Sequence, residues 1–356
     1  MPQSTDAFAS IDANPEPVGL ETGHHELGHG ARLRFVIGRG PPEMTSRGTV
    51  LLLQGRNEAV EKYYETIADL NARGFTVASF DWRGQGGSGR GTFLAGVGHV
   101  GSLSTLIHDL ERFLRDVVMD RCPPPYAVIA HSMGGLVALS ATSHLSSLVE
   151  RMVVLAPLVA LPGSAGMRRL QALVAGAFHW CGLGFVPLRR ARRLDPREPL
   201  AGNVLTSDAR RFERNRALQA AAPWLFVEGV SASWLRAVLK ATRRLDDSDR
   251  IARLDLPTLF LLPGDDRVVS TAAAERLAWR MRAGHSIRVP GARHELLQEA
   301  DRFREPALAA IEAFLADALP RPPPLPPIDE ALIGAAVAAE APPAALPSPE
   351  GDAVSR

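Results

Sequence analysis

The stretch YAVIAHSMGGLVALSATSHL at residues 126–145 decides the fold class. Its first part, up to His131, is an apolar run typical of a buried strand, and the part from Gly134 has a helical pattern. Ser132 therefore falls at a sharp strand-to-helix turn, with Ala130 two positions before it. This spacing matches the G-x-S-x-G elbow, with alanine in place of the first glycine, and such an elbow exposes its serine oxygen above a sheet. We predict that Ser132 is a nucleophile and not an ordinary helix cap.

Short apolar runs alternate with helical patterns on both sides of this turn. The runs are rich in Val, Ile, Leu and Phe and end at turn residues, as strands buried on both faces do. We expect strands at residues 32–39, 49–55, 75–82, 126–132, 151–157, 257–264 and 286–292. We expect helices at residues 60–73, 103–120, 134–148, 271–282 and 305–319. This alternation predicts a mostly parallel sheet with helices on both faces.

Length and composition fit one large α/β domain with an insertion, or two domains. The chain has 356 residues, of which 46% are hydrophobic, and can bury a large core. Its 40 Lys and Arg nearly cancel its 39 Asp and Glu, so no net basic field favours a nucleic-acid partner. The two cysteines, Cys122 and Cys181, lie in no metal or disulfide motif. No run of about 18 apolar residues is free of charge and proline. We expect a cytoplasmic protein with no membrane span and no metal.

Three segments depart from the alternation of strands and helices. Residues 1–29 mix turn formers with histidines, and we expect a flexible leader there. Residues 320–356 are rich in Pro and Ala, and we expect a disordered tail. Residues 161–256 show no clear strand and are too long for one crossover, which predicts a helical cap on a core of residues 30–160 and 257–319. Some aromatic residues of this cap should line a substrate cleft: Phe178, Trp180, Phe185, Trp224 and Trp234, with Phe212 and Phe226 as further candidates.

The late strands supply the base and the acid that a serine nucleophile needs. One strand ends in GDDRVV and another in GARHE, so both place polar side chains at the carboxyl edge of the sheet. Ser132, Asp266 and His294 follow the chain order nucleophile, acid, histidine that accompanies the elbow motif. Asp265 and Glu295 stay open as alternative acids.

Acyl transfer also needs hydrogen-bond donors for the charge that develops on the substrate carbonyl oxygen. One donor should be the backbone N–H of Met133, directly after the nucleophile. The other should be the N–H of Arg56 in the loop Gln54-Gly55-Arg56, because Gly55 lets the backbone bend inward. A surface turn is the competing interpretation of that loop.

The segment Gly84-Gln85-Gly86-Gly87-Ser88-Gly89 matches the G-x-G-x-x-G pattern of dinucleotide sites and follows a predicted strand. A dinucleotide site also needs a helix directly after the glycines, and GRGTFLAGVGHV has no helical pattern. We therefore assign no nicotinamide or flavin site and expect no cofactor.

The chain resembles the α/β-hydrolases and, among them, the bacterial lysophospholipases and monoacylglycerol lipases. The resemblance spans residues 30–318 and is carried by LLLQGRNE, KYYETIADLNARGFTVASFDWRGQGGSGR, AHSMGG, LTSDARRFERNRAL, GDDRVV and GARHELLQE. It implies an α/β-hydrolase fold with an open eight-stranded sheet, a helical cap after the sixth strand, and no metal. Members of this branch usually have His-Gly where this chain has Gln54-Gly55, a departure that removes one side-chain hydrogen bond from the loop.

The resemblance also implies the reaction. We expect a serine carboxylic-ester hydrolase that cleaves the acyl ester of a lysophospholipid or monoacylglycerol through an acyl-enzyme. A broad-specificity short-chain esterase is one alternative, and a non-catalytic module that binds an apolar ligand is another. A lipid substrate is compatible with transient contact with a membrane surface, and the sequence does not indicate an oligomeric state.

Overall fold

The computed structural model describes residues 8–316, except for 29, 91–93, 95, 191–199 and 228. The proline-rich segment 320–356, for which we expect disorder, lies outside the described residues. Eight strands form one sheet, in the spatial order β1 (Glu21–Gly28), β2 (Ala31–Gly38), β4 (Thr76–Phe80), β3 (Thr49–Leu53), β6 (Tyr126–His131), β7 (Arg151–Leu155), β10 (Thr258–Pro263) and β11 (Gly284–Val289). All pairings from β4 to β11 are parallel, whereas β1–β2 and β2–β4 are antiparallel. The expectation of a mostly parallel eight-stranded sheet is confirmed.

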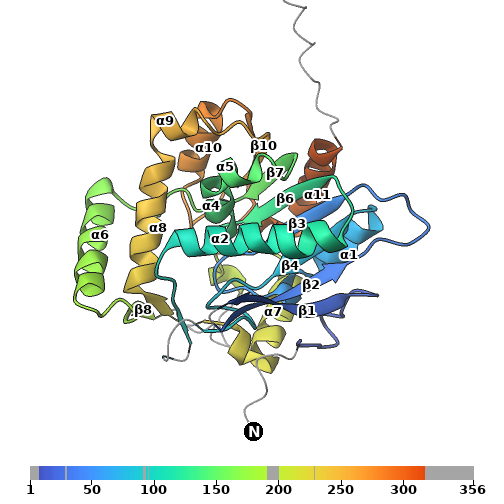
Figure 1. The fold of residues 1–356 in the computed structure, drawn as a ribbon, viewed down its shortest axis with the longest axis horizontal. Coiled ribbons are helices and arrows are strands. Elements are labelled where there is room, and N and C mark those ends of the chain that lie inside the picture. Colours follow the sequence, from blue (N-terminus) through green and yellow to red (C-terminus); the bar gives the residue numbers. More distant parts are fainter. Residues whose placement is uncertain are drawn as a thin grey trace, which may run out of the picture. The chain divides into compact units, whose positions relative to one another are not determined.

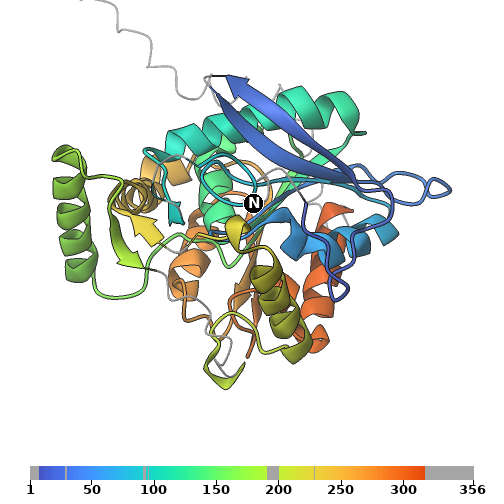
Figure 2. The same cartoon turned by 90° about the horizontal axis from the view of Figure 1, so that it is seen from below.

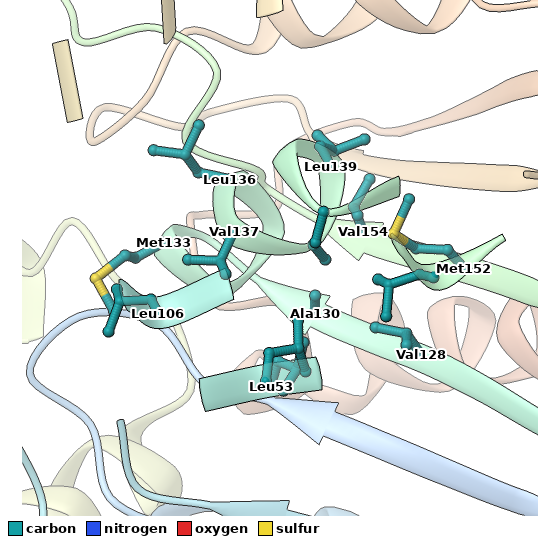
Figure 3. Close-up of a cluster of buried hydrophobic side chains, with 14 of the residues drawn as sticks. Leu53, Leu106, Val128, Ala130, Met133, Leu136, Val137, Leu139, Met152 and Val154 are labelled. Carbon is teal, nitrogen blue, oxygen red and sulfur yellow. The ribbon is translucent and has the colours of Figure 1, made fainter. Parts of the chain in front are cut away.

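Helices cover both faces of the sheet, as the alternating pattern predicts. One core cluster packs α2 (Leu103–Phe113), α4 (Met133–Ser140) and α10 (Thr271–Arg280) on one face, and a second packs α1 (Tyr64–Ala72) and α11 (Asp301–Leu315) on the other. Figure 1 shows α2 crossing the sheet on the side of α4. Successive strand residues alternate between the faces, so Val128 and Ala130 join the first cluster while Ile129 joins the second. Figure 3 shows side chains of α4, with Leu136 and Val137 among them, packed over these strands.

Two strands differ from the sequence expectation. Residues 21–28 are not part of a flexible leader, because they form β1 and pair antiparallel with β2 along most of its length. Only Leu27 of this strand is buried, so main-chain pairing, which leaves no pattern in the sequence, supplies most of its contacts. The last strand, β11, is not buried on both faces, since its side chains are exposed or half-buried at the edge of the sheet.

The expected cap segment, residues 161–256, lies between β7, the sixth strand of the sheet along the chain, and β10. Its described helices of four or more residues are α6 (Ala165–Trp180), α7 (Ala209–Ala221), α8 (Ala232–Leu245) and α9 (Ser248–Ile251). Figures 1 and 2 both show α6 beside α8, and α8 contacts α4 and α2 of the core. The segment also contributes β8 (Pro187–Arg190) and β9 (Gly229–Ser231) to a small sheet with β5 (Val97–Gly98). The sequence shows no clear signal for these strands, because strands this short show no periodicity.

Polar contacts attach the cap segment to the core at several places, among them α7 and the loop that carries His294. On α7, Arg211 and Arg214 form ion pairs with Glu65 of α1. In residues 290–295, the histidine loop that carries His294, the N–H of Glu295 donates to the carbonyl of Leu205 at 2.8 Å. The Arg293 side chain donates to the carbonyls of Asn203 and Thr206, at 2.6 and 2.8 Å. The loop that carries His294 is therefore hydrogen-bonded directly to the cap segment.

Candidate active site

Ser132 stands at a strained turn between β6 and α4. Its φ of 51° and ψ of −111° lie outside the regions that non-glycine residues favour, which costs about 1–3 kcal/mol. Backbone hydrogen bonds hold this conformation, since Ser132 N–H donates to Leu155 and its carbonyl accepts from Leu136 and Leu158. A Cβ at Gly134 would lie 2.6 Å from the Gln54 carbonyl oxygen, so glycine is required for α4 to approach the end of β3.

Ser132, His294 and Asp266 form one hydrogen-bonded chain. Ser132 Oγ lies 3.0 Å from His294 Nε2, and His294 Nδ1 lies 2.8 Å from Asp266 Oδ2. Because an ionised carboxylate only accepts, Nδ1 carries the proton and Nε2 is free to accept the serine hydroxyl proton. The structure thus brings together the three residues that the motif order selects.

Asp266 remains ionised in this arrangement. Burial raises the pKa of its carboxyl group. The hydrogen bond and charge of His294, together with two backbone donors, lower this pKa by a larger amount, so the net pKa lies below the usual range. The donors are the N–H groups of Val268 and Val269, which lie 2.7 and 3.0 Å from Oδ1. Asp266 can therefore stabilise a protonated His294 while its other oxygen fixes the loop.

The two alternative acids have other partners. The Asp265 side chain is 45% exposed and pairs with Arg267. Glu295 is buried, and its carboxylate lies 2.6 Å from Lys62 Nζ. Within the described part of the chain, the carboxylate at hydrogen-bond distance from His294 is that of Asp266.

The backbone N–H groups of Arg56 and Met133 donate to no group among the described residues. The Arg56 side chain is held elsewhere, since Nη2 donates to the Gly229 carbonyl at 2.7 Å and the guanidinium lies 5.3 Å from the Trp234 ring centre. Burial lowers the pKa of Arg56 to about 10. Of the two predicted donors, Arg56 lines the cavity that contains Ser132, and Met133 follows Ser132 directly in the chain.

A cavity of about 820 Å³ opens above Ser132. Its size lies within the usual range for small-molecule sites. Most of the lining is apolar and comes from the cap segment, including Leu170, Leu205, Phe212, Leu218, Phe226 and Trp234. The expectation for the five selected aromatic residues was mostly wrong: Trp234 lines the cavity, but Phe178, Phe185 and Trp224 do not, and Trp180 is 80% exposed.

A buried ionic cluster, which has only a weak signal in the sequence, lies next to the site. Glu58 accepts hydrogen bonds from the Gly55 N–H, from Tyr63 OH at 2.7 Å and from Lys62 Nζ at 2.8 Å. Lys62 also binds Glu295, so one ammonium joins the Gly55 loop to the histidine loop. The sequence signal of this cluster is the spacing of Glu58, four residues before Lys62, which is one of only two lysines in the chain.

His131 extends this cluster to the nucleophile. Its Nδ1 lies 3.3 Å from Glu58, and its ring centre lies 4.9 Å from that of His294. Burial lowers the pKa of His131, but the charge and hydrogen bond of Glu58 raise that pKa more, and the net shift is upward. For Glu58 the signs are reversed: burial raises its pKa, but the charges of Lys62 and His131 bring the pKa well below the usual value.

The glycine-rich segment 84–89 packs around a buried ion pair. A Cβ on Gly86 would collide with the Asp81 carboxylate, and one on Gly87 would collide with the Arg34 guanidinium. The next described regular element after these glycines is the short strand β5, not a helix. The glycines therefore permit close packing against Asp81 and Arg34.

The described residues contain no group of three or more His, Cys, Asp or Glu side chains arranged to hold a metal ion. Among the described helices, none is both long enough and apolar enough to cross a bilayer.

Comparisons with known proteins agree with this geometry. The family model described as serine aminopeptidase, S33, matches residues 44–301. The chain belongs to this α/β-hydrolase family. It is 31% identical over 284 residues to lysophospholipase L2 of Escherichia coli, covering 74% of this chain and 79% of that protein. A probable lysophospholipase L2 of Haemophilus influenzae is 25% identical over 276 residues, covering 77% of this chain and 85% of its own.

Solved structures share the fold of this family member. The monoglyceride lipase of Saccharomyces cerevisiae, solved with a substrate analogue, has a TM-score of 0.66 at 20% identity and covers 89% of this chain and 99% of its own. The monoacylglycerol lipase of Paleococcus ferrophilus has a TM-score of 0.62 at 21% identity, covering 80% and 98%. The resemblance to the lysophospholipase and monoacylglycerol lipase branch, and the fold it implies, are confirmed.

Proposed function

We propose that this α/β-hydrolase is a serine carboxylic-ester hydrolase that cleaves the acyl ester of a lysophospholipid or monoacylglycerol. The observation that carries the proposal is the hydrogen-bonded chain from Ser132 through His294 to Asp266. Ser132 and His294 of this chain line the apolar cavity. A protein that only binds an apolar ligand has no use for a base and an acid aligned on a strained serine. Hydrolysis is therefore favoured over a binding module.

In the proposed mechanism, Ser132 Oγ attacks the ester carbonyl carbon while its proton moves to His294 Nε2. The carbonyl oxygen becomes an oxyanion, which the N–H groups of Arg56 and Met133 stabilise. As the C–O bond breaks, His294 returns the proton to the glycerol oxygen, leaving an acyl-Ser132 ester. Water then attacks this ester with His294 as base, which releases the fatty acid and restores the serine. Asp266 stabilises the imidazolium in both steps.

The cavity supports a single acyl chain as the group that is bound. Its apolar walls suit methylene groups, each of which contributes about 0.8 kcal/mol when buried. The carboxylates of Glu58 and Glu295, which also line the cavity, both pair with Lys62. Neither carboxylate is therefore free to bind the amino terminus of a peptide. This argues against an aminopeptidase, the activity that the family description names. Two relatives named as lysophospholipases support the lipid substrate.

We further assign residues 30–160 and 257–319 to a catalytic core and residues 161–256 to a cap over the site. We place the protein in the cytoplasm, with transient contact with a membrane surface. Exposed apolar side chains on α6 support such contact: Met167, Leu170, Leu173, Val174 and Trp180. Because three of these, Met167, Leu170 and Val174, also line the cavity, the apolar surface is continuous with the site.

Labelling with a fluorophosphonate, compared between the wild type and Ser132→Ala, tests the nucleophile. A substrate series then tests the lipid: kcat/KM should be highest for lysophospholipids and monoacylglycerols and low for diacyl phospholipids, measured below micelle formation. Rates that fall steadily from acetate esters upward would favour the short-chain esterase. No labelling and no turnover would favour the binding module.

A further inference from the structure

We propose that Gln85 is a positioning residue that orients the Gly55–Arg56 peptide so that the Arg56 N–H points to the oxyanion. The inference rests on the proposed function, because it concerns the donor that stabilises the transition state. Gln85 is 4% exposed and lies in the glycine-rich segment 84–89. Its Nε2 donates to the Gly55 carbonyl at 2.8 Å, and its Oε1 accepts from the Asn57 N–H at 3.1 Å.

The bond to the Gly55 carbonyl fixes the donor on the other side of the same peptide. In a planar trans peptide, the C=O and the N–H point in opposite directions. Holding the Gly55 carbonyl against Gln85 therefore directs the Arg56 N–H away from Gln85. Gly55 lies against His131, the residue before Ser132, since a Cβ built on Gly55 would lie 2.9 Å from His131 Nδ1. Arg56 and Ser132 line the same cavity.

Two further backbone groups of this loop are also hydrogen-bonded. The Trp82 indole N–H donates to the Gln54 carbonyl at 2.9 Å, and Glu58 accepts from the Gly55 N–H. With the Asn57 N–H bound to Gln85, the N–H of Arg56 is the one in 55–57 that has no acceptor among the described residues. Such a loop keeps its geometry while charge develops on the substrate, which is what an oxyanion site requires.

Glutamine is suited to this place because its amide both donates and accepts. Backbone N–H groups can only donate and carbonyls can only accept, so the two partners fix which way the amide lies. A carboxylate at the same position would keep the acceptor for Asn57 but lose the donor for Gly55. The glycines on each side, with φ of 88° at Gly84 and 55° at Gly86, adopt the left-handed conformations that this loop needs.

The variants Gln85→Ala and Gln85→Glu test the role with a soluble p-nitrophenyl ester. Removing one oxyanion donor costs about 10²–10³ in kcat, and a misdirected donor should cost about 10- to 100-fold, with KM nearly unchanged because the bond acts in the transition state. A boronic acid that mimics the tetrahedral intermediate should lose affinity by a similar factor.

A pH profile separates positioning from packing. In Gln85→Glu, the carboxyl group can donate to the Gly55 carbonyl only when protonated, so the ratio of its kcat to that of the wild type should rise as the pH falls from 8 to 5. Ser88→Ala is the matched control, because Ser88 lies in the same segment and bonds to Arg34 and Asp81 instead. It should lower the melting temperature and leave kcat unchanged.

If the Gln85 variants kept the kcat of the wild type, this inference would be overturned, while the proposed function would stand. A loss of kcat of equal size in Ser88→Ala, or a ratio for Gln85→Glu that does not change with pH, would show a packing role and overturn it as well. A wild type with no Ser132-dependent hydrolysis would overturn the proposed function first.

Discussion

Replacing Asp266 by Asn, with Asp265→Asn as the matched control, tests which of two adjacent carboxylates orients the histidine. The side chain of Asp266 is fully buried and accepts three hydrogen bonds, one from His294 and two from backbone N–H groups. Asp265 is half exposed and pairs only with Arg267 within the described chain. The two substitutions are chemically identical, so any difference between them comes from position.

The expected loss follows from the histidine tautomer. Asparagine at 266 keeps an oxygen for the Val268 and Val269 N–H groups, so the free energy of unfolding should fall by only about 1 kcal/mol. Its NH₂ then faces His294 Nδ1 and forces the ring proton onto Nε2, which can no longer accept the Ser132 proton. We expect kcat to fall by about 10⁴-fold, or about 5 kcal/mol of transition-state stabilisation. Losing the exposed Asp265 pair should change kcat by less than about twofold.

The assay is steady-state hydrolysis of p-nitrophenyl butyrate at neutral pH, with thermal unfolding of each variant measured in parallel. Unfolding separates a damaged site from a damaged fold. If Asp265→Asn lost as much kcat as Asp266→Asn, or more, with both variants folded, the assignment of the acid would be wrong.

Three further outcomes are expected. Ser132→Ala and His294→Ala should each lower kcat by about 10⁶-fold and their combination little further, measured by single-turnover hydrolysis, and additive losses would contradict a concerted triad. Across p-nitrophenyl esters of rising length, kcat/KM should increase by at most about fourfold per methylene. Trp234→Ala should flatten this series, whereas the exposed Trp180→Ala should not; equal effects would argue against an acyl-binding cavity. Burial raises the pKa of Glu65, but hydrogen bonds from two arginines of α7 lower it more, so its contribution to stability is present above pH about 4.3 and is lost as the pH falls. The difference in melting temperature between wild type and Glu65→Gln should therefore shrink from pH 7 to pH 3, and a constant difference would contradict this linkage.

The core of the fold and the hydrogen-bonded triad were predictable because their signals are local. A buried strand shows as an apolar run, and the elbow around Ser132 demands small residues at fixed spacing. Parallel strands end at one edge of the sheet, so residues far apart in the chain, such as Asp266 and His294, could be placed together. The motif order selected Asp266 as the acid but left Asp265 open, because the sequence does not show which of two adjacent side chains points toward the histidine.

The features that the sequence did not predict depend on tertiary contacts. Trp180 ends α6 on its exposed side, and nothing in its neighbours reveals which face of that helix meets the core. The strand β1 contains Glu, Gly and His and is held by main-chain pairing with β2. The partners of Lys62 lie four residues before it and 233 residues after it, a separation that no pattern in the sequence connects.

The hydrogen bonds between the cap segment and the histidine loop bear on how such enzymes are engineered and how they diverge. A cap can be regarded as a module that is exchangeable between enzymes with the same catalytic core. Here the carbonyls of Asn203, Leu205 and Thr206 hold Arg293 and Glu295, the two neighbours of His294. A chimaera with a foreign cap would keep the triad residues yet lose the support on both sides of the base. In such a chimaera, residues 203–206 should be kept together with the core. Only the parts of the cap segment outside 203–206, such as the helices that line the cavity, should be exchanged.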